Sequence, residues 1–469
     1  MTQTIKNLKH SSTVKLITII FITVAMLIPV SMVEMTIHER SGLRTQAETS
    51  ISDRWGGRQK ISAPVLAIPY KEKRVERISH NSDWKTAGKQ VENQKISYID
   101  RTMYLLADNV SLSTTMKTEV RYLGIYEMPV YITDSYIKGS FNRKDLENIN
   151  RQLTNINWKH ARVILPIDDV RGIRSISKLS FGKNNIDFIP GQNNSVSFRG
   201  IDAPVNLSSK INKNINFSLN ISLSGSKQLN YLPLARTSNI TLTSDWSNPG
   251  FTGSYLPATR NITQNGFNAE WKILGLNRSF GQSLSDSFDK NSINNSKFGI
   301  TLFQPADIYQ QNIRSVKYAA LFIALTFMAF FLFEIFFELN IHPIQYFFNG
   351  GALSTFYLLL LALSEHLHFS MAYLLSAISI VLLMTGYSMT ILKQRKRGAL
   401  IGLITAIIYS FLYFLIQSEQ NSLLFGAIGF FVSLATIMYM TRHINWYNIN
   451  SENNRNVINT SVTDTAEEN

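Results

Sequence analysis

Six apolar segments constrain what this chain can fold into more than any other feature of its sequence. Each is 18 to 22 residues long, close to the roughly 20 apolar residues that cross a hydrocarbon core about 30 Å thick. One segment lies near the start of the chain, and five lie in its last third: Val14–Met35, Tyr318–Glu338, Tyr346–Leu363, Met371–Leu392, Gly398–Ile416 and Leu423–Met440. The sequence therefore predicts six transmembrane helices.

The first segment, Val14–Met35, is either a membrane anchor or a secretory signal peptide. Lys6 and Lys9 precede it, and a basic start suits both. A signal peptide has a shorter apolar stretch of about 7 to 15 residues, followed by small residues at the cleavage site. The segment here is longer, and MLIPVSMVEM at its end offers no such site. The sequence favours an uncleaved anchor.

Basic residues in the short connections between spans predict the orientation. The connector LKQRKRG at Leu392–Gly398 is strongly basic, whereas SEHLHFS at Ser364–Ser370 and QSEQNS at Gln417–Ser422 contain no Lys or Arg. Short basic loops remain in the cytoplasm. We therefore expect both ends, residues 1–13 and 441–469, to be cytoplasmic and residues 36–317 to lie outside.

The long polar part of the chain, residues 36–317, has the pattern of a β-rich domain. Apolar and polar residues alternate over residues 96–116, 205–225 and 240–246, which is typical of half-buried antiparallel strands. The stretch Arg143–Leu153 is compatible with one polar helix. The predicted fold is an α+β membrane protein: a large β-sandwich-like extracytoplasmic domain, one N-terminal transmembrane helix at 14–35 and a five-helix bundle at 318–440.

Aromatic and proline residues between Trp246 and Trp271 allow two interpretations. Such rings can stack on glycans, or they can pack inside a sheet domain whose turns are held by proline. We favour the packed core with proline-fixed turns.

Charge and cysteine content limit the partners. The chain carries a formal net charge of +14 and contains no cysteine, so the domain must hold together through its core without disulfides. We expect membrane lipids as partners and no nucleic acid. The positive charge is either dispersed for solubility or attracts an anionic envelope component. Other envelope proteins are further candidate partners.

Polar residues near the ends of the predicted spans are the candidate binding residues, because charges within spans are costly and often functional. They are Glu334, His342, Gln345, Tyr346, Ser364, Glu365 and His366. Each has a structural alternative. Glu334 lies close enough to a helix end to reach water, and Pro343 after His342 suits the first turn of a helix. Glu365 and His366, with His368, form only a weak metal-binding pattern, so we predict no metal site and no cofactor.

Long blocks of sequence resemble the CreD family of bacterial inner-membrane proteins. They include LPLARTSNITLTSDWSNPGFTGSYLPATRNITQNGFNAEWKILGLNR at Leu232–Arg278, PADIYQQNIRSVKYAALFIALTFMAFFLFE at Pro305–Glu334 and IHPIQYFFNGGALSTFYLLLLALSEHLHF at Ile341–Phe369. The resemblance covers nearly the whole chain. It implies an inner-membrane protein linked to cell-envelope integrity and expressed under a two-component system that responds to envelope and β-lactam stress. It implies no catalytic residues.

The search for catalytic motifs leaves two function classes. The sequence contains no H-E-x-x-H, G-x-S-x-G or Walker motif, so no catalytic residue is predicted. The first class is a non-enzymatic envelope protein that binds or scaffolds through its outer domain. The second is a transporter or a lipid- or peptidoglycan-handling enzyme with its site in the transmembrane bundle. Because the five C-terminal spans show no clear internal repeat, the sequence favours the first class.

Overall fold

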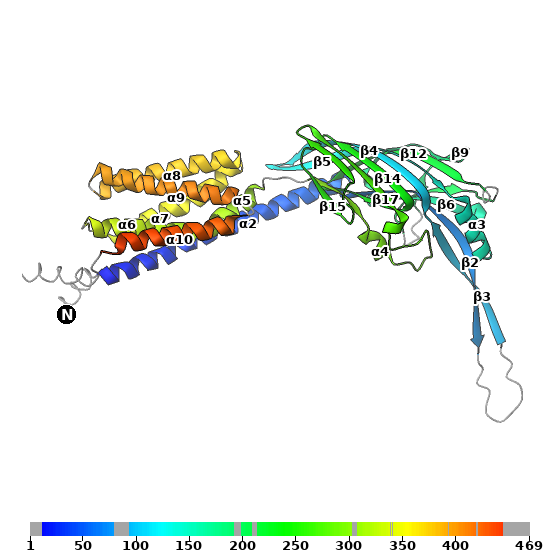
Figure 1. Cartoon of the computed structure of the whole chain (residues 1–469), viewed down its shortest axis with the longest axis horizontal. Helices are drawn as coiled ribbons and strands as arrows, with labels where there is room; N and C mark the ends of the chain where they lie inside the picture. The colour runs from blue at the N-terminus through cyan, green and yellow to red at the C-terminus, as the bar shows by residue number, and fades with distance from the viewer. Residues whose placement is uncertain are drawn as a thin grey trace, which may run out of the picture. The chain divides into compact units, whose positions relative to one another are not determined.

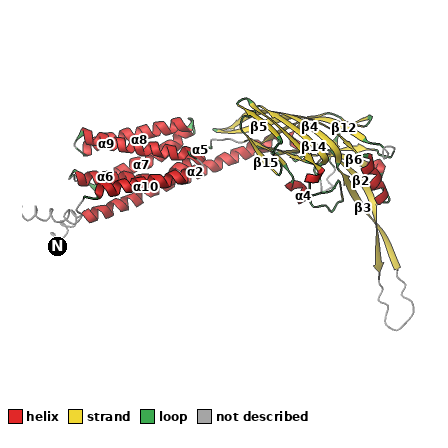
Figure 2. Ribbon diagram, in the orientation of Figure 1, coloured by secondary structure: helices red, strands yellow, loops and turns green. Residues whose placement is uncertain are grey.

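The computed structural model describes residues 12–78, 93–191, 198–208, 213–302, 307–337, 339, 341–392, 394–418 and 421–443. Two compact units are present (Figure 1): Met1–Arg44 with Ala306–Asn469, called here the membrane unit, and Thr45–Pro305, called here the domain. The described strands all belong to the domain (Figure 2). Most of the predicted cytoplasmic ends, residues 1–13 and 441–469, lies outside the described residues.

The membrane unit confirms the predicted spans. Among the described residues, six helices are long and apolar enough to cross a membrane, one N-terminal and five C-terminal. They are α2 (Ser12–Trp55), α6 (Ala319–Phe336), α7 (Pro343–Ser364), α8 (Phe369–Ile391), α9 (Arg395–Gln417) and α10 (Ser422–Thr441). A shorter helix, α5 (Ile308–Lys317), precedes α6. Glu338, where the second predicted span ends, lies outside the described residues.

Helix α2 is longer than the apolar segment that predicts it. It continues for 20 residues beyond Met35, to Trp55, so residues 36–55 are helical rather than part of a sheet. The extension contains no proline, and once a helix is nucleated each further residue adds a hydrogen bond at little cost. The structure places the border between membrane unit and domain at Arg44 and Thr45, inside this helix.

Three sheets build the domain. The nine-stranded sheet has the order β16-β17-β14-β4-β5-β12-β8-β9, with β7 also paired to β12. Its strands are β4 (Ala107–Leu123), β5 (Tyr126–Phe141), β7 (Ile173–Ile176), β8 (Leu179–Phe181), β9 (Asn184–Ile186), β12 (Ile215–Ser226), β14 (Ala235–Ser244), β16 (Thr259–Thr263) and β17 (Gly266–Leu274).

The two smaller sheets complete the domain. The six-stranded sheet has the order β10-β11-β6-β2-β3-β18, and the four-stranded sheet has the order β1-β13-β19-β15. The former contains β2 (Val65–Ile78), β3 (Asn93–Leu105), β6 (Ala161–Pro166), β10 (Ile189–Pro190), β11 (Gly200–Val205) and β18 (Ser283–Leu284). The latter contains β1 (Gln59–Ser62), β13 (Gln228–Leu232), β15 (Pro249–Gly253) and β19 (Phe298–Leu302).

Short helices lie between the strands. The predicted polar helix at Arg143–Leu153 is present as α3 (Arg143–Gln152), and Asn142 caps it by accepting a hydrogen bond from the backbone N–H of Lys144. Leu146 and Ile149 form its buried side, one turn apart as an amphipathic helix requires. The remaining short helices are α4 (Lys290–Asn295) and the 3-10 turns η1 (Trp158–His160), η2 (Val170–Gly172) and η3 (Gly275–Asn277).

Alternation along the strands produces one buried and one polar face in the nine-stranded sheet. Leu112, Ile137 and Leu219 are paired across β4, β5 and β12 and are buried. Burying one such side chain stabilises the fold by about 1.5–3 kcal/mol. They belong to a core to which all three sheets contribute. This confirms the sandwich-like arrangement predicted from the alternating runs.

The aromatic residues between Trp246 and Trp271 support the packed-core interpretation. Trp271 and Phe267 are buried. The Trp271 ring centroid lies 6.0 Å from that of Phe251 and 5.7 Å from that of Phe298, within the range of favourable aromatic contacts. Rings held in this way are not available for stacking on a glycan.

Candidate functional site

The candidate residue Glu334 is the centre of a polar cluster in the membrane unit. Its side chain is 6% exposed. One carboxylate oxygen accepts a hydrogen bond from the backbone N–H of Ile341 at 2.9 Å and forms an ion pair with Lys15. The other accepts from the Tyr346 hydroxyl at 2.9 Å. We call Lys15, Glu334, Ile341 and Tyr346 the Glu334 cluster; it joins α2, α6 and α7.

The start of α7 positions two donors of this cluster. His342 is the N-cap: its ring nitrogen Nδ1 accepts from the backbone N–H of Ile344 at 3.3 Å. Gln345 Oε1 accepts from the backbone N–H of His342 at 3.1 Å, which completes a capping box with Pro343 in the first turn. The candidate residues His342 and Gln345 are thus held as helix caps beside the cluster.

The Glu334 cluster neutralises a charge that membrane burial makes costly. A carboxylate in a low-dielectric interior is tolerated when a cation and hydrogen-bond donors surround it. Lys15 supplies the cation, and Ile341 and Tyr346 supply donors. The arrangement stabilises the contact of three helices. Both carboxylate oxygens of Glu334 are bound by groups of the protein and do not face a substrate site.

A second cluster lies at the C-terminal end of α7. Glu365 accepts a hydrogen bond from the Tyr309 hydroxyl at 3.2 Å, and Arg40 Nε lies 3.8 Å from the same carboxylate oxygen. The Asn312 side-chain amide donates to Ser364 Oγ at 2.9 Å. We call these five residues the Glu365 cluster. The candidate residues Ser364 and Glu365 are therefore brought together with α2 and α5.

The beginning of α5 adds an ion pair next to this cluster. Asp307 caps α5 by accepting from the backbone N–H of Tyr309 at 2.9 Å, and the same oxygen lies 2.9 Å from Arg44 Nη1. Arg40 and Arg44 are one turn apart on α2, so both face the start of α5 and the end of α7. This part of the membrane unit is held by charge pairs.

His366 joins neither cluster. Its side chain is exposed, as is that of His368. In the part of the chain that the structure describes, no group of three or more His, Cys, Asp or Glu residues has the arrangement of a metal site.

Sequence reasoning did not select Arg40, Tyr309 and Asn312. The available signal was spacing: Arg40 and Arg44 are four residues apart, and Tyr309 and Asn312 are three residues apart. Both spacings place side chains on one face of a helix. The polar composition of both segments had instead placed them in the sheet domain.

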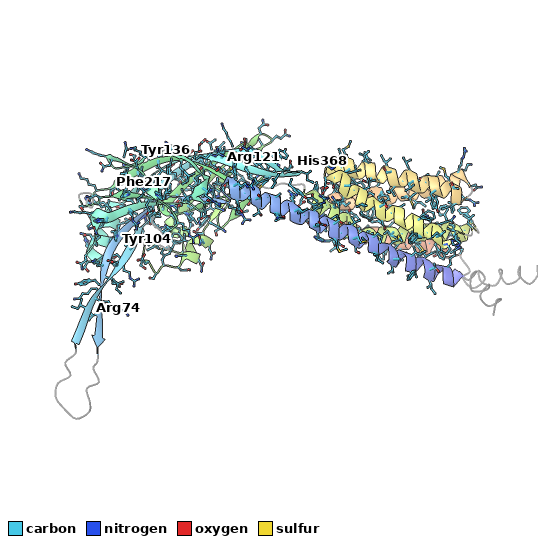
Figure 3. The ribbon with its side chains drawn as sticks, turned by 180° about the vertical axis from the view of Figure 1, so that it is seen from behind. Arg74, Tyr104, Arg121, Tyr136, Phe217 and His368 are labelled. Atoms are coloured by element: carbon cyan, nitrogen blue, oxygen red, sulfur yellow. The ribbon has the colours of Figure 1, made fainter. Side chains whose placement is uncertain are left out.

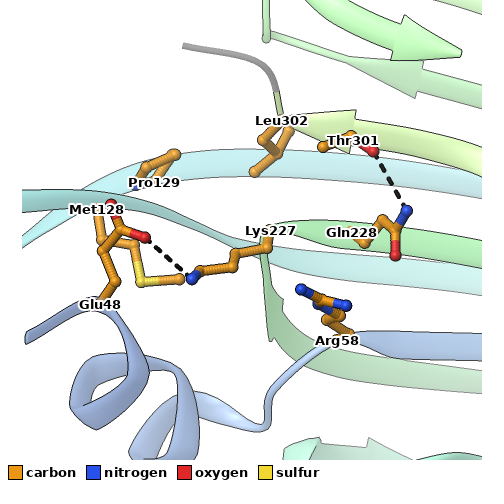
Figure 4. Close-up of a pocket in the computed structure, with 8 residues that line it drawn as sticks. All are labelled: Glu48, Arg58, Met128, Pro129, Lys227, Gln228, Thr301 and Leu302. Carbon is orange, nitrogen blue, oxygen red and sulfur yellow. Dashed lines mark hydrogen bonds and ion pairs between the residues drawn. The ribbon is translucent and has the colours of Figure 1, made fainter. Parts of the chain in front are cut away.

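The domain contains a cavity of about 270 Å³ at the end that carries Glu48 and Leu302 (Figure 4). Lys227 forms an ion pair with Glu48 at 2.9 Å, and Gln228 Nε2 donates to Thr301 Oγ1 at 3.3 Å. The exposed Arg58 also lines the cavity. The pocket thus offers a guanidinium group and apolar walls, suited to a small anionic group.

A second hollow, of about 520 Å³, lies on the polar face of the nine-stranded sheet. Asn239, Ser111, Lys138 and Ser218 line it from four neighbouring strands and are paired in one row. Hydroxyl, amide and ammonium groups here can form several hydrogen bonds to a polar ligand.

Comparison with known proteins places the chain in a family. The family model described as "Inner membrane protein CreD" matches residues 11–447. Inner membrane protein CreD of Escherichia coli (strain K12) is 31% identical over 422 residues, which cover 90% of this chain and 91% of that protein. The chain belongs to the CreD family. It is a multi-pass inner-membrane protein, as the sequence resemblance predicted.

Proposed function

We propose that this CreD-family protein supports cell-envelope integrity without catalysing a reaction. Its domain binds a polar envelope component on the outer side of the membrane, and the helical bundle anchors it. Both chain ends lie in the cytoplasm, and the protein acts in the envelope and β-lactam stress response of a two-component regulon. The regulon and the stress response rest on the family resemblance alone.

This proposal rests on the ion pairs and hydrogen bonds that the carboxylates of the bundle form with other residues of the bundle. Glu334 is paired with Lys15, and Glu365 with Arg40 and Tyr309. A group that relays protons or binds a transported ion has to exchange partners during its cycle. Here the carboxylates are held by donors from several helices, which is the behaviour expected of a scaffold.

The polar sheet face supports the binding role. Its hollow presents side chains from β14, β4, β5 and β12 in register, and a sheet is a rigid platform for such groups. The ammonium of Lys138 adds a positive charge, which suits an anionic component of the envelope. We therefore assign binding to this face rather than to the bundle.

Complementation of a deletion strain under detergent or β-lactam stress tests the proposal. We expect Glu365→Gln and His366→Ala to restore growth. Ser218→Trp, which fills the hollow, should fail to do so, and Asn268→Trp serves as its control because Asn268 is exposed on β17 of the same sheet away from the hollow. Membrane levels of every variant are measured in parallel.

Two outcomes would contradict the proposal. If Ser218→Trp complements as well as Asn268→Trp, the hollow is not the binding surface. If Glu365→Gln or His366→Ala is inactive while stably inserted, the function requires the bundle, as in a transporter or a lipid- or peptidoglycan-handling enzyme.

A further inference from the structure

The hairpin between β4 and β5 extends beyond the rest of its sheet. The neighbouring strand β14 pairs with β4 only as far as Met116, and β12 pairs with β5 only from Val130 onward. Between these points, residues 117–129 form a two-stranded ribbon that pairs with no other strand among those described. Gly124, at φ 61°, allows the tight turn at the end of the ribbon.

The end of this ribbon is apolar and exposed. Val120, Tyr122, Leu123 and Ile125 are 42%, 68%, 41% and 47% exposed; we call these four residues the fingertip. Single exposed apolar residues are common on protein surfaces, but a contiguous group at the end of a projecting element marks a binding surface. An isolated two-stranded ribbon is also marginally stable without a partner.

Contacts within the domain show which way the fingertip points. Trp55 Nε1 donates to the backbone carbonyl of Tyr131 at 3.3 Å, and Glu48 lines the same cavity as Met128 and Pro129. From Trp55 to Glu48, α2 therefore runs in the same direction as β5 does from Tyr131 to Met128. The ribbon points toward Thr45, where α2 continues into the first transmembrane span.

Basic groups lie behind the apolar tip, toward the base of the ribbon. The guanidinium carbons of Arg121 and Arg174 lie 4.4 and 4.5 Å from the centroid of the Trp55 ring, and Arg121 also pairs with Glu119 at 2.7 Å. Arg58 is exposed in the cavity at this end of the domain. Figure 3 labels Arg121 on the ribbon. An apolar tip with a tyrosine, and arginines behind it toward the base of the ribbon, match the interface of a phospholipid bilayer.

We propose that the fingertip inserts into the headgroup region of the bilayer that holds the transmembrane spans. The domain would then contact the membrane through this hairpin in addition to its covalent connections. Tyr122 supplies the amphipathic ring, Leu123 and Ile125 enter the acyl boundary, and Arg121 remains near the lipid phosphates.

Site-specific fluorescence tests this assignment in the full chain. Because the chain has no cysteine, Ile125→Cys provides a single labelling position for an environment-sensitive fluorophore. Thr115→Cys is the matched control, since Thr115 is exposed on β4 outside the fingertip. Both proteins are reconstituted in phosphatidylcholine vesicles with and without phosphatidylglycerol, and quenched by a shallow spin-labelled lipid or by aqueous iodide.

We expect the label at position 125 to be quenched severalfold more by the lipid, and severalfold less by iodide, than the label at position 115. Tyr122→Asp in the same labelled chain should weaken the lipid quenching. A stronger lipid effect with phosphatidylglycerol assigns part of the contact to the arginines. Equal iodide quenching at both positions overturns the proposal. Protection from iodide without lipid quenching also overturns it, and indicates a protein partner at the fingertip.

Discussion

At the scale of single residues, the membrane unit shows how a buried carboxylate becomes tolerable. Glu334 has around it a cation from Lys15, which is distant in sequence, and a backbone N–H and a phenol from Ile341 and Tyr346 at the start of α7. Each donor compensates part of the desolvation cost of the charge. Removing one member should therefore destabilise the bundle more than removing the whole charge pair does.

A double-mutant cycle of Lys15 and Glu334 checks this. Glu334→Gln leaves the Lys15 ammonium without its counter-ion, so we expect a loss of about 2–3 kcal/mol, less than the roughly 3–5 kcal/mol of fully buried pairs, because Lys15 is partly exposed. Lys15→Met with Glu334→Gln should recover part of that loss. The measurement is denaturation of the full chain in detergent, followed by far-ultraviolet circular dichroism.

The control for this cycle is Thr436→Val. Thr436 is exposed on α10 and its hydroxyl bonds only within its own helix, to the Val432 carbonyl, so its replacement should change stability by no more than about 0.5 kcal/mol. Strictly additive effects of the two charge substitutions would show that Lys15 and Glu334 do not interact.

In the domain, the single residue Asp169 contributes to stability in a way that depends on pH. Side-chain hydrogen bonds from Arg171 hold the pKa of the Asp169 carboxyl below its ordinary value. A carboxyl with a lowered pKa in the folded state stabilises the fold above its unfolded pKa of about 3.9, and this stabilisation is lost as pH falls through the folded pKa.

We therefore expect Asp169→Asn to lower the melting temperature of the domain at pH 7, and this difference from the unmodified chain should shrink below about pH 4. Tryptophan fluorescence of the full chain reports the transition, because five of the six tryptophans lie in the domain. A difference that stays constant down to pH 3 would mean that the ionised carboxylate is not what stabilises this site.

At the scale of elements, the nine-stranded sheet depends on close contacts at particular positions. Gly139 in β5 is one of them, because a Cβ atom there would lie 2.3 Å from the Asn109 carbonyl oxygen and 2.6 Å from Phe217 Cζ. Both distances are far inside van der Waals contact, and the first involves the backbone of the neighbouring strand, which cannot rotate away.

Gly139→Ala should therefore destabilise the domain by about 1–3 kcal/mol, the usual cost of overpacking. Melting followed by tryptophan fluorescence measures the loss. Gly281→Ala is the matched control: its nearest contact would be 3.5 Å, to the Ser283 carbonyl oxygen, so we expect a change within about 0.5 kcal/mol. Equal stability of the two variants would contradict the close packing of β5 against β4 and β12.

At the scale of the whole molecule, the proposed topology has a direct test. Arg395, Lys396 and Arg397 are the first residues of α9, in the basic segment that follows α8. This segment should be cytoplasmic because short basic connections are retained there. We expect alkaline phosphatase fusions to be inactive after Arg397 and active within the domain, for example near residue 225. The reverse pattern of activity would show that the topology is the opposite of the one proposed. The domain would then be cytoplasmic and could not bind an envelope component.

Local sequence patterns were enough to predict the spans and many strands. A stretch of about 20 apolar residues has to leave water whatever its neighbours are, and period-two alternation over residues 96–116 matches a sheet with one buried face. Patterns of this kind depend on composition within a short window. For that reason the six spans, α3 and the alternating strands agree with the structure.

The length of α2 and the partners of the polar residues were decided only by the tertiary structure. By composition alone, the polar residues 36–55 resemble a loop or a strand. They are helical because they extend the helix that the preceding apolar segment has already formed. Lys15 and Glu334 are 319 residues apart, and Arg40 meets Glu365 only when α2 packs beside α7. The sequence by itself determined which segments leave water, because burial depends on local composition. Tertiary packing decided which charges neutralise one another there, because that depends on which helices are neighbours.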